Sequence, residues 1–325
     1  MRTITSLEAW EADAARPPTV VTVGNFDGVH RAHSALLRAL CRDAAEQGGE
    51  AVVVTFEPHP GRILHPATAP RLITPLEEKL RLLAASGVNA VLLLPFSRDL
   101  SLLSALAFVE RVLVRGLRAR AVHEGENFRF GHRQEGTAAL LSELGREFRF
   151  EVRLHPDVLV RGAPVSSSRI RALIARGAAG QARHLLGRWF GIRGRLAAGR
   201  GVGRQRTVPT LNLQHYDELL PAQGVYCTRV ELDGAGYAAL TNVGVRPTFG
   251  EGGPLTVESH LLHPPAGLES RLGAELEVRF MARLRDERRF DSPEALRRQI
   301  EADIALGERY DRRIRATMDA GGIHA

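Results

Sequence analysis

The sequence of 325 residues contains two cysteines and no hydrophobic run long enough to cross a bilayer. Cys41 and Cys227 lie far apart and form no CxxC pair, which argues against a disulfide scaffold and against a cysteine zinc site. The first residues, MRTITSLEAWEADAARPP, lack the apolar segment of a secretory signal. These absences predict a cytoplasmic protein that does not span a membrane.

Lysine adds little to the charge, because arginine supplies nearly all of the cations behind the formal net charge of +7. A basic balance favours anionic partners such as nucleotides, phosphates or nucleic acid. The arginines are scattered, however, so a general compositional bias explains them at least as well. The sequence also lacks a basic and aromatic strip and a nucleic-acid-binding signature, so nucleic acid is not favoured as a partner, and no oligomeric state is predicted.

Strands and helices are predicted to alternate as far as residue 190. This alternation of strands and helices indicates a parallel sheet that is covered by helices on both faces. In such sheets ligands bind at the carboxyl ends of the strands. The expected strands lie in 19–24, 51–56, 89–95, 117–125 and 150–156, and the expected helices in 34–49, 75–87, 103–116, 137–148 and 166–177.

The pattern changes after Phe190, where short alternating runs are separated by turn residues until a last helical segment at 292–313. This pattern is typical of a small antiparallel barrel closed by a C-terminal helix. A chain of this length also favours two domains over one. We therefore predict an α/β chain with one domain at 1–187 and a second at 188–325.

Residues 20–34, VVTVGNFDGVHRAHS, carry the first functional pattern. His30 and His33 are three apart at a helix start, so they share one face beside the unpaired N–H groups of the helix terminus, a natural site for an anion. Gly24 and Gly28 let the backbone approach a ligand. The turn has no Walker A or GxGxxG motif. A histidine pair that merely caps the helix is the plainer alternative, and zinc is disfavoured because no third ligand cluster is evident.

The stretch GNFDGVHRAH resembles the HxGH nucleotidyltransferase signature, in the form found in the adenylyltransferase half of the bacterial bifunctional riboflavin kinase/FAD synthetase family. TFEPHP (55–60), HEGENFRFG (123–131) and SSSRIR (166–171) resemble further blocks of that family in the same order. The resemblance implies a Rossmann-like nucleotidyltransferase sheet followed by a small kinase barrel. It covers nearly the whole chain, which makes it more specific than any single motif.

The resemblance implies roles for matching residues in the first half. The two histidines would contact the ATP phosphates, and Asn127 would lie next to the flavin. A serine-capped helix and a loop turn are the plainer readings of the SSSRIR and Asn127 positions. The residues expected to form the nucleotide and phosphate site are Gly24, Asn25, Phe26, Asp27, Gly28, His30, His33, Ser167, Ser168 and Arg169.

The second half resembles the riboflavin kinase signature in GVGRQR (201–206) and TVPTLNL (207–213). By this resemblance Thr210 and Asn212 would hold Mg²⁺ and the ATP phosphates, and their oxygen atoms suit a hard cation. Gly201 and Gly203 would cradle phosphates. In LTVESHLL (255–262), Glu258 would act as the catalytic base. Arg285 would line the flavin-side loop.

The implied chemistry is phosphorylation of riboflavin by ATP to give FMN, followed by adenylylation of FMN to FAD with release of pyrophosphate. Mg²⁺ would assist both steps. Two departures from the family pattern bear on this: Ala32 replaces a glycine between the histidines, and Thr207 and Val208 replace a glycine and an aromatic residue. The alternatives are a chain that keeps only one activity, a nucleic-acid-binding protein that reuses the fold, and a nucleotidyltransferase acting on another phosphate.

Overall fold

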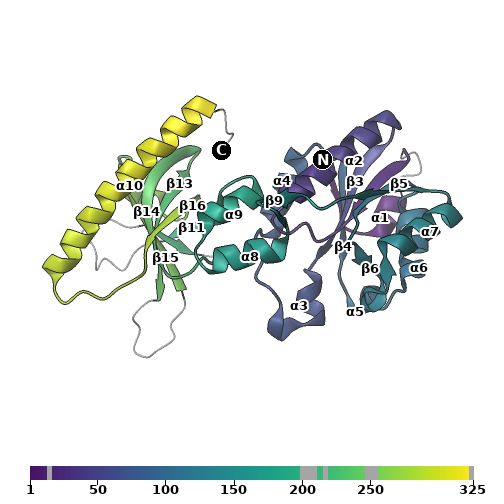
Figure 1. Cartoon of the computed structure of the whole chain (residues 1–325), viewed down its shortest axis with the longest axis horizontal. Coiled ribbons are helices and arrows are strands. Elements are labelled where there is room, and N and C mark those ends of the chain that lie inside the picture. Colours follow the sequence, from purple (N-terminus) through teal and green to yellow (C-terminus); the bar gives the residue numbers. More distant parts are fainter. Residues whose placement is uncertain (13–16, 198–210, 215–218, 246–254, 322–325) are drawn as a thin grey trace. The chain divides into compact units, whose positions relative to one another are not determined.

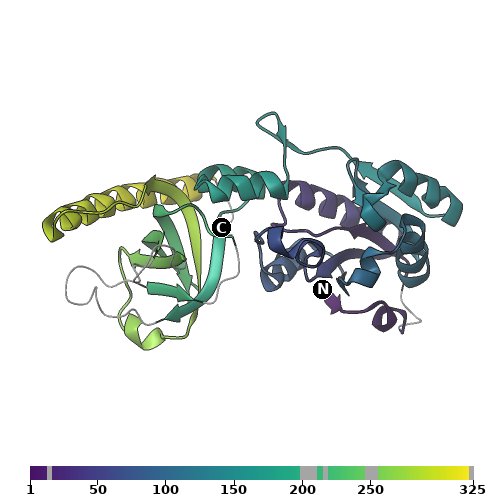
Figure 2. The same cartoon turned by 90° about the horizontal axis from the view of Figure 1, so that it is seen from below.

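The computed structural model describes residues 1–325 except 13–16, 198–210, 215–218, 246–254 and 322–325. The chain divides into two compact units, Met1–Ser167 and Ser168–Ala325 (Figures 1 and 2). The first is an α/β unit and the second contains a closed barrel and a long helix, so the predicted fold class is confirmed. Among the described helices, none combines the length and the apolar character that crossing a bilayer requires.

The first unit is built on a sheet of six parallel strands in the order β1-β4-β3-β2-β5-β8. β2 lies between β3 and β5, so the strand order reverses at β2 and β5, which is where ligands bind in open sheets of this kind. The strands are β1 (Arg2–Ile4), β2 (Thr19–Val23), β3 (Glu50–Glu57), β4 (Ala90–Pro95), β5 (Ala119–Gly125) and β8 (Glu151–His155).

Helices cover both faces of this sheet and form two separate hydrophobic cores (Figure 1). One core joins Leu37 and Leu40 of α2 and Leu83 of α4 to Val53, whereas the other joins helices α1, α6 and α7 to the opposite face. The helices are α1 (Leu7–Glu11), α2 (Arg31–Glu46), α3 (Pro60–Leu64), α4 (Leu76–Ala85), α5 (Arg98–Ser101), α6 (Ala105–Phe108) and α7 (Ala138–Phe148), with short turns η1 (Pro66–Thr68) and η3 (His132–Gln134).

Several parts of this unit differ from the sequence-based expectation. The segment expected as one helix at 103–116 is a short α6 followed by a π-helix, η2 (Val109–Gly116). The edge strand β1 was not expected, because three residues are too few to display a period. Two small ribbons also escaped prediction for the same reason: β6 (Arg129–Phe130) with β7 (Gly136–Thr137), and β9 (Leu159–Val160) with β10 (Ala163–Pro164).

The second unit is a closed antiparallel barrel in the order β11-β12-β15-β14-β13-β16. Helix α10 lies along its outside against β13 and β14, and α9 packs on β11 and β16 (Figure 2). Its elements are α8 (Ser167–Ala175), α9 (Ala179–Leu186), β11 (Phe190–Ala197), β12 (Leu211–Gln214), β13 (Gly224–Leu232), β14 (Ala235–Val245), β15 (Leu255–Leu261), η4 (Leu268–Arg271), β16 (Glu275–Arg285) and α10 (Pro293–Gly321).

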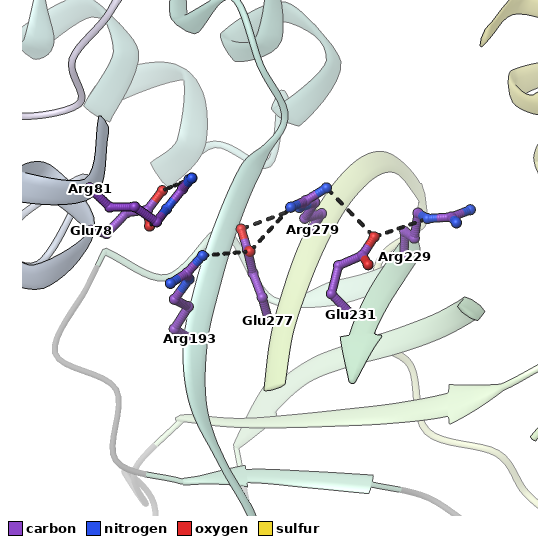
Figure 3. Close-up of polar contacts among 7 residues, drawn as sticks. All are labelled: Glu78, Arg81, Arg193, Arg229, Glu231, Glu277 and Arg279. Carbon is purple, nitrogen blue, oxygen red and sulfur yellow. Dashed lines mark hydrogen bonds and ion pairs between the residues drawn. The ribbon is translucent and has the colours of Figure 1, made fainter. Parts of the chain in front are cut away.

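A ladder of alternating charges crosses three neighbouring strands of the barrel (Figure 3). Glu277 of β16 accepts from Arg193 of β11 at 3.2 Å and pairs with Arg279 at 3.3 Å. Glu231 of β13 then pairs with Arg279 at 3.5 Å and with Arg229 at 3.1 Å. Exposed ion pairs contribute little stability singly, but cross-strand pairs of opposite charge favour this strand register.

Candidate functional site

The turn after β2 has an unusual backbone. Phe26, Gly28 and Val29 all have positive φ angles, of 47°, 87° and 34°. Such angles are ordinary for glycine but unfavourable for a β-branched residue such as Val29. Strained backbone of this kind concentrates at functional sites, so the turn itself marks GNFDGVH as more than a connection.

The two signature histidines form a reciprocal cap at the start of α2. His30 is the N-cap residue, and its Nδ1 accepts from the His33 N–H, while His33 Nδ1 accepts from the His30 N–H, both at 3.4 Å. The imidazole rings stack with their centroids 3.6 Å apart. In a neutral ring that accepts at Nδ1, the hydrogen lies on Nε2, which is then a donor. The two histidines therefore do cap the helix, as the plainer alternative expects. The same cap orients both rings at the helix N-terminus, where anions bind.

Asp27 anchors the turn rather than facing open solvent. Its buried carboxylate accepts from the backbone N–H groups of Ile73 at 2.9 Å and Thr74 at 3.1 Å. The Gly28 N–H in turn donates to the Thr74 hydroxyl at 3.1 Å, and the Ser167 hydroxyl donates to the Asp27 carbonyl at 2.8 Å. Asp27 thus holds the turn in place through backbone contacts.

Two buried charged residues beside this turn were missed by the sequence reasoning. Lys79 of α4 donates to the Asn25 carbonyl and to the Thr55 hydroxyl, both at 3.4 Å. Glu124 of β5 accepts from the Val23 N–H at 2.6 Å, just before the turn, and burial raises its pKa well above the ordinary value. No local pattern could have found them, because their partners lie 24 to 101 residues away.

The remaining predicted residues of the first half lie at varied positions. Asn25 is exposed and Phe26 is buried beneath His33, with ring centroids 4.8 Å apart. Ser168 is exposed and Arg169 is half-buried in the first turn of α8. Asn127 is also exposed and donates to the Asp157 carboxylate at 3.3 Å.

A buried network behind the site ties α2 to the sheet. Asp43 accepts from His123 Nε2 at 2.7 Å and pairs with Arg153 at 2.8 Å, and His155 Nε2 lies 3.0 Å from His123 Nδ1. Burial raises the pKa of Asp43, but the hydrogen bonds from His123 and Gln47 and the Arg153 charge outweigh it, so that pKa is lowered. Burial lowers the pKa of both histidines, which favours neutral rings.

Three side chains lie in one row across neighbouring barrel strands: the predicted Asn212 and Glu258, and Asn242. Asn212 of β12 is paired in register with Glu258 of β15, which is paired in turn with Asn242 of β14. Because paired residues of antiparallel strands project to the same face, the amide and carboxylate groups lie side by side. Asn242 also donates to Glu287 at 3.3 Å. Asn242 was missed, although it lies in TNVGVRPTFG (241–250), a stretch that the resemblance covers.

Four residues that the resemblance to riboflavin kinases singles out lie outside the described residues: Gly201, Gly203, Thr207 and Thr210. Within the described part of the chain, no group of three or more histidine, cysteine or acidic residues is arranged to hold a metal ion.

Arg285, predicted for the flavin side, is fixed by an ion pair. Its guanidinium meets the buried carboxylate of Asp303 on α10 at 2.7 Å and 3.0 Å. Its Nη1 donates to the Asp286 carbonyl, and Phe290 lies 5.8 Å from its Cζ. The side chain is therefore pre-positioned between β16 and the helix.

Comparisons with known proteins match both units. The FAD synthetase family model matches residues 12–169, and the riboflavin kinase model matches residues 186–310. A bifunctional riboflavin kinase/FMN adenylyltransferase of Pseudomonas fluorescens is 40% identical over 88% of this chain and 91% of its own length. The chain belongs to that family. The Escherichia coli K12 member is 36% identical over 90% of this chain and 92% of its own length.

A solved structure confirms the likeness over both units. A Streptococcus pneumoniae protein described as a macrolide-efflux protein has 30% identity and a TM-score of 0.83, with 95% of this chain and 99% of that chain covered. The family membership makes this chain a transferase with riboflavin kinase and FMN adenylyltransferase activities. The predicted family, function and enzyme class are thus confirmed.

Proposed function

We propose that the two activities are divided between two domains, residues 1–187 and 188–325, with FMN adenylylation at the GNFDGVH turn and riboflavin phosphorylation at the Asn212–Glu258 row. The reciprocal cap of His30 and His33 supports the first assignment, since it fixes two ring donors at a helix N-terminus. The register of Asn212 with Glu258 supports the second. For the domains, we propose the division at 187/188, near the start of the riboflavin kinase match at residue 186.

In the adenylyl-transfer step, an FMN phosphate oxygen attacks the α-phosphorus of ATP and the bond to pyrophosphate breaks. His30, His33 and Arg169 would bind the triphosphate, with Ser167 and Ser168 adding hydroxyl donors. Gly24 and Gly28 let phosphates approach the turn, and Asn127 would contact the flavin. These residues position the reactants and stabilise the charge that develops during transfer.

In the kinase step, the ribityl hydroxyl oxygen attacks the γ-phosphorus of ATP, its proton passes to the Glu258 carboxylate, and ADP leaves. The Asn212 amide oxygen suits Mg²⁺, so Asn212, with Thr210 by the resemblance, would hold the cation together with substrate phosphates beside the base Glu258. Such a cation would neutralise phosphate charge. Arg285 would contact the flavin from its fixed position beside Asp303.

A cytoplasmic location is proposed because Cys41 and Cys227 are both free thiols. The substrates are ATP, riboflavin and FMN. Nucleic acid is not proposed as a partner.

Two single variants test the division, each followed by chromatography of riboflavin, FMN and FAD in the presence of ATP and Mg²⁺. Glu258→Gln should lose FMN formation by about 10²–10⁴-fold while it still converts supplied FMN to FAD. His33→Ala should accumulate FMN with little FAD. The exposed residues Glu275 and His65 provide matched controls, as Glu275→Gln and His65→Ala. Loss of both activities in either test variant, or of neither, would contradict the division.

A further inference from the structure

The positive charge of this chain is distributed in an unusual way. Of its 44 basic residues only Lys79 is a lysine, and all others are arginines. Lys79 is 7% exposed, and no arginine in the described part of the chain is buried so deeply. The sequence therefore uses lysine once, at a position more deeply buried than that of any arginine among the described residues.

That position is directly beneath the functional turn. The ammonium donates to the carbonyl of Asn25, in the turn after β2, and to the hydroxyl of Thr55, near the end of β3. It thus joins the carboxyl ends of two adjacent strands, next to the switch point of the sheet. A compact ammonium suits this place better than a planar guanidinium, whose five donors need more room and more partners.

Burying this charge works against the stability of the fold. Burial lowers the pKa of Lys79, whereas the charges of Glu57 and Asp27 raise it in part. Neither carboxylate forms an ion pair with Lys79, and Asp27 is occupied by the backbone of Ile73 and Thr74. An apolar side chain of similar length would avoid the desolvation cost altogether. A buried cation kept in spite of that cost points to function.

We propose that Lys79 is the positioning cation of the adenylyl-transfer site. Its ammonium holds the Asn25 carbonyl against Thr55, which fixes the turn that binds ATP, and it places one positive charge under the phosphates. The proposal rests on the assignment of adenylyl transfer to this turn. Glu78, the chain neighbour of Lys79 on α4, pairs with Arg81, and His30 and His33 cap each other in the turn.

The test compares Lys79→Met, which keeps the length but removes the charge, with Lys79→Arg, which keeps the charge. Arg38→Met, on the exposed face of α2, is the control for loss of one cation. For each full-length variant, kcat and KM for ATP in FAD formation from FMN are measured, with riboflavin kinase activity as an internal control. The melting temperature of the N-terminal unit is measured in parallel.

We expect Lys79→Met to lower kcat/KM for ATP by about 10²-fold, because the turn is released. Its melting temperature should stay unchanged or rise, its kinase activity should persist, and Lys79→Arg should not restore adenylyl transfer. Wild-type kcat/KM in either Lys79 variant, or activity lost only in step with a lower melting temperature, would overturn the proposal. A wild-type chain that makes FMN but no FAD would instead refute the adenylyl-transfer assignment itself.

Discussion

Replacing Asp43 by alanine should selectively destabilise the N-terminal unit. The carboxylate accepts from the buried His123 at 2.7 Å and from Gln47 at 2.9 Å, and it pairs with the partly exposed Arg153. Removing it leaves the imidazole N–H buried without an acceptor, at a cost of about 1–3 kcal/mol. The pair with the partly exposed arginine adds about 0–1 kcal/mol.

A total of roughly 1–4 kcal/mol corresponds to a fall in melting temperature of roughly 2–16 °C for a unit of this size. Because a single melting temperature is not well defined for a multi-domain protein, the assay should follow each activity after brief heating. FMN adenylyltransferase should be inactivated at the lower temperature, while riboflavin kinase keeps its wild-type profile. Glu147→Ala, on the exposed side of α7, is the control. An adenylyltransferase profile unchanged by Asp43→Ala, or an equal shift in both activities, would refute this reasoning.

Three further results are expected. The free energy of unfolding of the N-terminal unit should fall as the pH drops below about 6.5. The pKa values of His123 and His155 are lowered in the folded chain, so the unfolded chain binds more protons in this range. Denaturant titrations at several pH values would check this. Ala32→Gly should lower KM for ATP in adenylyl transfer and cost about 1 kcal/mol of helix stability, measured by kinetics and thermal unfolding. Asp303→Ala should raise KM for riboflavin, because Arg285 loses its bidentate partner, while FAD formation from FMN is unchanged.

Much of the fold was predictable because its signals are local. The strand at 19–24 and the helix that follows His33 are each defined by a period within a dozen residues, and β2 and α2 lie there. The barrel strand around Glu258 was predictable in the same way, including which residues share its face. The three-residue β1 and the π-helical η2 were not, since neither has a periodic pattern of its own.

The site was only partly predictable, because resemblance identifies residues in motifs but not their distant partners. His30 and His33 were identified, yet their reciprocal cap depends on backbone geometry. Lys79 lies within the segment expected as a helix at 75–87, where no local pattern marks it, and its contact with Asn25 spans 54 residues. The bond from Val23 to Glu124 spans 101 residues, and periodicity does not encode such a pairing.

The reciprocal cap of α2 also limits the charge balance of the adenylyl-transfer site. In a neutral ring that accepts an N–H at Nδ1, the hydrogen lies on Nε2, so each capped ring still has one donor to offer a ligand. Two neutral rings offer a triphosphate fixed dipoles but no net charge. Counter-charge for ATP at the proposed site then has to come from residues outside the pair.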